Sequence, residues 1–196
     1  MAHCGTRKFT QLIMQGTMMA VLIGCGVSRS AAEQPTPPAP SPTSLSSVPI
    51  ANDLQRAMLS AHNDARAAVG VGPVAWDTKL SAAAAAYARE LAANGRFEHS
   101  SSASRPDQGE NLWAGTTRAY SFEQMAGGWI DERRYFIAAV FPHVSTTGNW
   151  QDVGHYSQII WRNTTRIGCG IASNRHRDIL VCRYSSPGNF TGQRVF

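Results

Sequence analysis

A histidine stands near the start of the run Gly154–Trp161, which reads GHYSQIIW and alternates like a strand. An imidazole can bind a metal ion through a neutral nitrogen, and it can also move protons near neutral pH. Ser100 and Ser157 lie close to histidines in the sequence, but neither occupies the Gly-x-Ser-x-Gly pattern of a nucleophile elbow. The pattern therefore favours a metal site or acid–base chemistry over a serine nucleophile.

Several motifs together resemble one known family. They are the run 154–161, the Gly-Glu-Asn-Leu element 109–112, the segment 182–189 (CRYSSPGN) and the His-Asn-x-x-Arg element 62–66. They closely resemble the CAP superfamily, which takes in the cysteine-rich secretory proteins, insect-venom antigen 5 and the plant pathogenesis-related type-1 proteins. The resemblance covers essentially all of residues 54–192.

The resemblance implies a set of cleft residues. CAP proteins commonly display two histidines and two glutamates in a large cleft, and the matching positions here are His99, Glu110, Glu132 and His155. Two imidazoles can hold Zn²⁺ or another divalent cation, and carboxylates can ligate the ion or hold its water. Without a third strong ligand the site would be open and of modest affinity. No organic cofactor is expected. The alternative is a purely structural polar cluster.

Three classes of function follow from that cleft. The first is a binding module for a cation and a small or lipid-like ligand, with Trp113 and Ser157 expected at the cleft. The second is a metal-dependent hydrolase of peptides or phosphodiesters, in which Glu110 or Glu132 serves as general base. The third is a surface interaction protein whose cleft is vestigial.

Local patterns indicate helices first and strands last. Asn52 or Asp53 can cap a first helix ending near Gly70, and Trp76-Asp77 opens an alanine-rich helix that stops at Asn94-Gly95. Further elements are a capping-box helix from Ser121 to about Tyr135 and strands over 155–161, 166–172 and 178–184. This order predicts an α+β fold with an antiparallel sheet. The CAP resemblance narrows it to a three-layer α-β-α sandwich.

The cysteines point to export. The last two predicted strands form a hairpin that brings Cys169 and Cys182 close together, where an oxidising compartment would join them. Two buried free thiols are the alternative.

The N-terminus reads as an export signal, residues 1–24, in which a basic pair precedes a short apolar core. Leu22-Ile23-Gly24-Cys25 resembles the lipobox of bacterial lipoproteins, so Cys25 would be acylated and anchor the protein to a membrane facing the periplasm or cell exterior. The alternative is cleavage after Ala32, which releases a soluble secreted protein. A proline-rich tether, residues 25–52, would then lead to the CAP domain, residues 53–196.

The composition excludes one class of partner. The net charge is +5 over 196 residues, without a cluster of Lys or Arg. A nucleic-acid-binding protein would need a basic face or stripe, so no nucleic acid is expected.

Overall fold

A computed structural model of the protein describes the backbone of residues 48–196 and the side chains from residue 51 onward. The expected signal segment, the lipidation site at Cys25 and most of the expected tether lie outside these residues. None of the helices within residues 48–196 has the length and apolarity to cross a bilayer.

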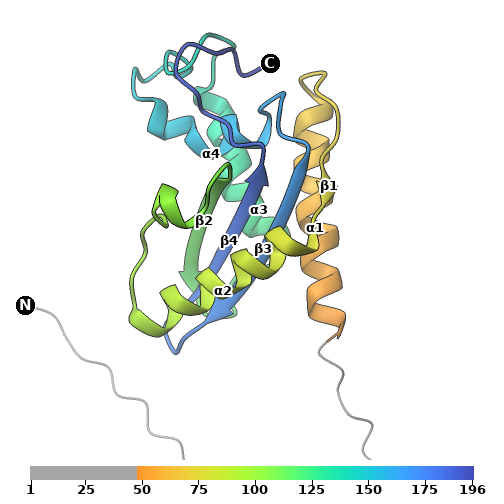
Figure 1. Cartoon of the computed structure of the whole chain (residues 1–196), viewed down its shortest axis with the longest axis vertical. Coiled ribbons are helices and arrows are strands. Elements are labelled where there is room, and N and C mark those ends of the chain that lie inside the picture. Colours follow the sequence, from red (N-terminus) through yellow and green to blue (C-terminus); the bar gives the residue numbers. More distant parts are fainter. Residues whose placement is uncertain (1–47) are drawn as a thin grey trace, which may run out of the picture. The chain divides into compact units, whose positions relative to one another are not determined.

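The described chain contains four α-helices and one four-stranded sheet (Figure 1). The helices are α1 (Val48–Ala67), α2 (Thr78–Asn94), α3 (Phe122–Ile130) and α4 (Gly154–Ile159). The strands are β1 (Ala75–Trp76), β2 (Gly109–Thr116), β3 (Arg166–Ser173) and β4 (Arg177–Ser185). Short 3₁₀ turns occupy Ser102–Ser104, Asp131–Tyr135 and Trp150–Val153.

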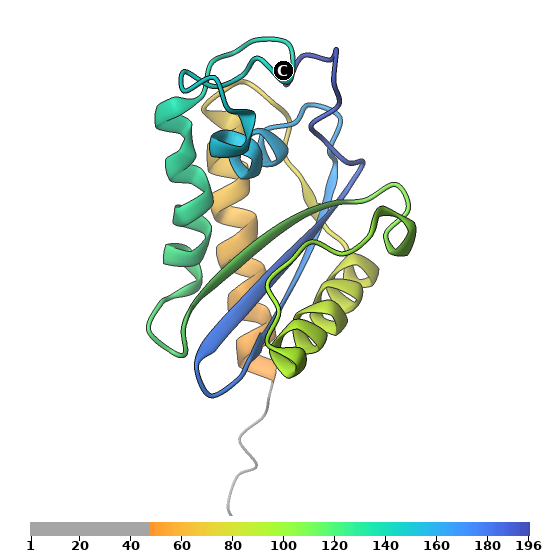
Figure 2. The same cartoon turned by 90° about the vertical axis from the view of Figure 1, so that its left-hand side faces the viewer.

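The sheet order is β1-β3-β4-β2, and it is antiparallel apart from the two-residue edge strand β1, which pairs with β3 in parallel. Figure 2 shows α2 on one face of the sheet and α1 with α3 on the other. The predicted three-layer α-β-α architecture is therefore confirmed.

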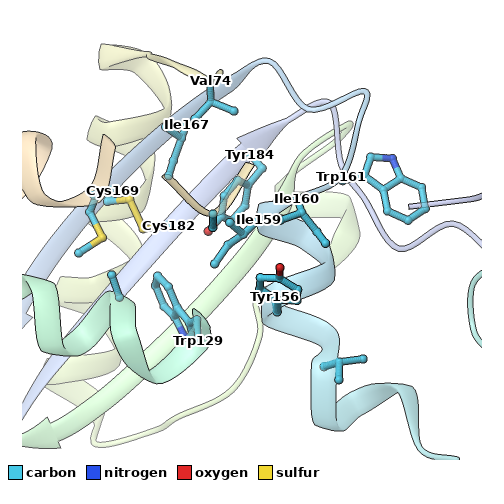
Figure 3. Packing of buried hydrophobic residues seen from close by; sticks show 14 of the residues in the cluster. Val74, Trp129, Tyr156, Ile159, Ile160, Trp161, Ile167, Cys169, Cys182 and Tyr184 are labelled. Atoms are coloured by element: carbon cyan, nitrogen blue, oxygen red, sulfur yellow. A yellow bond between two sulfur atoms is a disulfide. The ribbon is translucent and has the colours of Figure 1, made fainter. Parts of the chain in front are cut away.

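The side chains of β4 point alternately to the two faces of the sheet, and each face has its own hydrophobic cluster. Ile179 and Val181 pack with the alanines of α2, while Leu180, Cys182 and Tyr184 join the larger cluster beneath α1, α3 and α4. Successive residues of a strand point to opposite faces, so one strand supplies both cores. In Figure 3, side chains of α4 reach the same cluster as Trp129 of α3 and Tyr184.

The predicted caps and hairpin are confirmed. Asp77 accepts hydrogen bonds from the backbone N–H groups of Lys79 and Leu80, and Gly95 ends α2 in the left-handed conformation. Ser121 and Gln124 form the expected capping box of α3. Cys169 and Cys182 face each other on β3 and β4 and form a disulfide.

Two local predictions were wrong. The segment 155–161 is not a strand, because residues 154–159 form helix α4, in which Tyr156, Ser157, Gln158 and Ile159 are all buried. Burial of four consecutive residues removes the alternation that the sequence suggested. Helix α1 begins at Val48, so Asn52 and Asp53 lie inside it and do not cap it.

Strand β2 was not anticipated as an element. Its first residues were recognised only as a motif, yet Gly109–Thr116 pairs along its whole length with β4. Because its first four residues are buried, the strand lacks the exposed alternate positions that mark a half-buried strand in a sequence.

Candidate functional site

The four expected cleft residues form two separate histidine–glutamate pairs. Nδ1 of His99 lies 2.8 Å from Oε1 of Glu110, and Nδ1 of His155 lies 2.5 Å from Oε1 of Glu132. An ionised carboxylate only accepts hydrogen bonds, so each Nδ1 must carry the proton. In the neutral rings, Nε2 then holds the lone pair.

The first pair joins a loop to the sheet. His99 stands in the segment between α2 and β2, and Glu110 is the second residue of β2. Register places Glu110 directly opposite Arg183 of β4, so the two side chains share one face of the sheet. The sequence expectation named Glu110 but missed Arg183, since nothing local marks an arginine as the partner of a residue more than seventy positions upstream.

The Glu110 side chain is fully buried, and it accepts three hydrogen bonds from the protein. Oε1 accepts from His99 and from the backbone N–H of Ser100, while Oε2 accepts from the Ser100 hydroxyl at 2.9 Å. Nε of Arg183 lies 3.0 Å from Oε2 as an ion pair whose N–H is not aligned for a hydrogen bond. Arg105 adds a second positive charge at 3.8 Å.

These contacts determine the protonation of Glu110. Burial by itself would raise the pKa of the carboxyl, but the hydrogen bond from His99 and the charge of Arg183 outweigh it. The pKa of Glu110 therefore lies below its ordinary value, and the group remains a carboxylate that orients His99.

The second pair builds the start of helix α4. Oε2 of Glu132 accepts from the backbone N–H groups of His155 and Tyr156, each at 3.0 Å, while Oε1 binds the His155 ring. A carboxylate placed on the free N–H groups of a helix start stabilises the helix. Trp129 stacks on the His155 imidazole with ring centroids 6.0 Å apart, which fixes the plane of the ring.

Both histidines border one cavity of about 400 Å³. His99 is about half exposed and His155 about one third exposed. No hydrogen bond to Nε2 of either ring is present among residues 51–196. The cavity is also bordered by Glu110, Asn111, Trp150, Gln151 and Asn189.

Three expected site residues lie behind or away from this cavity. Glu132 holds His155 from behind. Ser157 is buried and donates its hydroxyl proton to Oδ1 of Asn189, so it supports the cleft wall. Trp113 does not border the cavity and packs edge-on against Tyr120, with centroids 5.1 Å apart. The tryptophan at the cavity is Trp150, which sequence reasoning did not single out.

The site can offer a metal ion two imidazole nitrogens. Within the described part of the chain, no three His, Cys, Asp or Glu side chains come together in a way that could hold an ion. The glutamates are engaged in holding the histidines. A carboxylate on the far nitrogen of a ligating histidine is the usual outer-shell arrangement of metal sites, because it fixes the tautomer and raises ligand basicity. The residues thus fit an open site with water in the remaining positions.

A third histidine, His62 of α1, is not part of the cavity. It is fully buried, with Nδ1 2.7 Å from the Met58 carbonyl oxygen and Nε2 2.9 Å from the Tyr184 hydroxyl. Because a carbonyl accepts, Nδ1 donates and Nε2 accepts from Tyr184. Burial lowers the pKa of His62 to about 4, so the ring is neutral at pH 7.

Comparison with known proteins gives consistent matches. The model of the cysteine-rich secretory protein (CAP) family matches residues 59–184. A pathogenesis-related protein of PR-1 type from Sambucus nigra is 36% identical over 148 residues, covering 75% of this chain and 84% of its own. Pathogenesis-related protein 1A of Nicotiana tabacum is 37% identical, covering 74% and 83%.

Solved structures show the same fold. The crystal structure of NaASP2 with Zn²⁺ superposes with a TM-score of 0.64 at 22% identity and covers 74% of this chain and 85% of its own. That of Na-ASP-1 gives a TM-score of 0.63 at 23% identity, covering 74% of this chain and 41% of its own. At 22% and 23% sequence identity, these similarities establish the shared fold alone.

Proposed function

This chain belongs to the cysteine-rich secretory protein (CAP) family, and from that premise we propose that it is an exported binding protein whose cleft holds a divalent cation through His99 and His155. The single observation that carries the proposal is the state of the two rings. Each Nδ1 is bonded to a glutamate, and each Nε2 is left without a partner at the edge of the same cavity.

Zn²⁺ is the ion that best suits two imidazole ligands, since it is bound by neutral histidine nitrogens and accepts tetrahedral sites completed by water. The crystal structure of NaASP2 with Zn²⁺ is a fold relative that supports this choice. When bound, such an ion would lower the pKa of its water towards about 7. The Glu110 carboxylate is buried and already accepts hydrogen bonds from His99 and Ser100, so we propose binding, and not hydrolysis with Glu110 as base, as the role of the cleft.

Export is supported by two observations. The disulfide between Cys169 and Cys182 belongs to an oxidising compartment, and the matched family is one of secretory proteins. We further propose that Cys25 carries a lipid that holds the protein at a membrane. Replacing Cys25 with Ser should move the full chain from the membrane fraction to the soluble fraction of the exporting cell. An unchanged membrane fraction would rule out this anchor.

Isothermal titration of Zn²⁺ into the metal-stripped full chain tests the cation site. We expect 1:1 binding with a dissociation constant in the micromolar range, lost in the His99→Ala/His155→Ala variant. The matched control is His143→Ala/His176→Ala, which removes two exposed histidines that do not border the cavity. Absence of heat with the folded wild type, or equal loss in the control, would exclude the site.

A further inference from the structure

Arg66 of α1 is a buried cation outside the cleft. It is 1% exposed, and no carboxylate among residues 51–196 forms an ion pair with it. A guanidinium keeps its proton at physiological pH, so the groups that surround it must satisfy its charge. Here those groups are backbone carbonyl oxygens.

Four N–H groups of Arg66 donate to four carbonyl oxygens. Nη1 donates to Ile159 at 2.8 Å and to Trp161 at 3.0 Å. Nε donates to Gly72 at 2.6 Å, and Nη2 donates to Thr164 at 2.8 Å. Ile159 is the last residue of α4, so its carbonyl is one of the last four, which have no partner within a helix. The negative end of the helix dipole therefore faces a fixed positive charge.

The first turn of α4 carries His155. The helix has only six residues, too few to be stable by itself, so its position depends on contacts with the rest of the protein. Glu132 accepts from N–H groups of the first turn, and Arg66 donates to the carbonyl at the other end. Ile159 follows His155 by about one helical turn. A displacement of Ile159 would therefore displace His155 with it.

We propose that Arg66 is a positioning residue of the cation site: by holding the end of α4, it sets the place of the His155 imidazole relative to that of His99. The inference rests on the proposed function, because the two rings act together only as ligands of one ion. Zn–N bonds are about 2.0–2.1 Å long, so a displacement of about 1 Å weakens coordination.

Arg66→Lys tests this role, because an ammonium keeps the charge but lacks the planar fork that reaches several carbonyls at once. Isothermal titration of the full chain should show zinc affinity about 10-fold lower, the smaller end of the effect of losing a group that orients a metal ligand. In the metal-free, ¹⁵N-labelled protein, the ring nitrogen signals of His155 should shift, while those of His99 stay unchanged. A general loss of stability would not distinguish the two rings.

Two control variants separate positioning from side-chain chemistry and from stability. Arg162→Lys makes the same change at an exposed arginine in the turn after α4. Gly170→Ala introduces a clash between β3 and α2, away from α4. Both variants should keep the zinc affinity and the His155 ring signals of the wild type.

Hydrogen exchange in the wild type gives a second test that needs no folded variant. The N–H of Ile160 donates to the Tyr156 carbonyl at the end of α4. If Arg66 holds this end, the Ile160 N–H should exchange about as slowly as the amides in the middle of β4. A short helix with a free end would open locally and exchange at least about 10-fold faster.

Several results would overturn the proposal. They are wild-type zinc affinity or wild-type His155 signals in Arg66→Lys, equal shifts of the two histidine rings, an equal loss of affinity in either control, or fast exchange of the Ile160 N–H. If the wild type binds no zinc, the cation site is excluded. The ring signals of the metal-free protein and the exchange of Ile160 still decide whether Arg66 positions His155.

Discussion

Each cleft histidine is held by a glutamate, but the two carboxylates differ in how much of their hydrogen-bonding capacity the protein uses. Glu110 is buried and accepts from His99 and Ser100 while pairing with Arg183. Glu132 is partly exposed and caps α4 while binding His155. Glu110 is therefore the more sensitive residue for both stability and site geometry.

We expect Glu110→Gln to lower the free energy of unfolding by about 3–5 kcal/mol, because it leaves the charge of Arg183 buried without its counter-ion. Zinc affinity should fall about 10–100-fold, since the orientation of His99 is lost. Urea unfolding at pH 7 and zinc titration measure the two effects. Glu98→Gln, at an exposed ion pair with Arg96, is the control and should change stability by less than about 1 kcal/mol. Equal effects of the two changes would contradict the prediction.

The lowered pKa of His62 predicts how the free energy of unfolding depends on pH. Its pKa is about 4 in the folded protein and 6.5 in a free histidine, so the unfolded chain binds the proton first as the pH falls. Protonation of His62 therefore does not lower the free energy of unfolding above pH 6.5. Between pH 6.5 and about pH 4 it lowers that free energy by about 3 kcal/mol in total. Urea unfolding across this range should show a shallower decrease for His62→Gln than for the wild type. If the unfolding free energies of the variant and the wild type decreased in parallel, groups other than His62 would be responsible for the decrease.

At the scale of secondary-structure elements, α2 approaches the sheet so closely that two glycines of β3 are required. A Cβ on Gly168 would lie 2.2 Å from the Ser81 backbone nitrogen, and one on Gly170 would lie 2.3 Å from Cα of Ala85. Backbone atoms cannot move aside as the end of a flexible side chain can. The alanine-rich sequence of α2 and the glycines of β3 thus form one packing surface.

Gly170→Ala should destabilise the protein by about 1–3 kcal/mol or more, since the added methyl group overpacks a helix–sheet contact. Gly127→Ala is the matched control: its Cβ would meet nothing within 4 Å, and it lies inside α3. There we expect a gain of about 0.5–1 kcal/mol from higher helix propensity. Thermal melting of the two variants compares them directly, and a neutral Gly170→Ala would show that α2 can move away.

At the scale of the whole described domain, strand β4 contributes side chains to both hydrophobic clusters. The disulfide links β4 covalently to β3. Cys169 and Cys182 are both buried in the larger cluster. The bridge closes a loop with a sequence separation of 13, which restricts the unfolded chain. Its contribution therefore belongs to the stability of the whole domain.

We expect the Cys169→Ala/Cys182→Ala variant to lose about 3 kcal/mol of unfolding free energy on the chain-entropy account. Guanidinium unfolding of the two proteins, both under oxidising conditions, measures the difference. The wild type treated with reductant and unfolded in parallel is the control and should match the variant. A variant as stable as the oxidised protein would show that the bridge contributes nothing.

The sequence alone predicted the structural features whose stabilising contacts are local. Asp77 caps α2 within three residues, Ser121 and Gln124 form a capping box, and the hairpin carries both cysteines. Such hydrogen bonds lie within one segment, so the residues that make them are visible side by side. The motifs also identified all four members of the histidine–glutamate pairs, through their resemblance to one family.

Features that depend on residues far apart in the sequence could be seen only in the tertiary structure. The start of α4 is held by Glu132, 23 residues before His155, so the segment is a helix although its alternation favours a strand. Strand pairing brings Arg183 opposite Glu110, and folding places Trp150 at the cavity. Long-range pairing and burial override local propensity, because a segment's own pattern does not contain the groups that satisfy its backbone and charges.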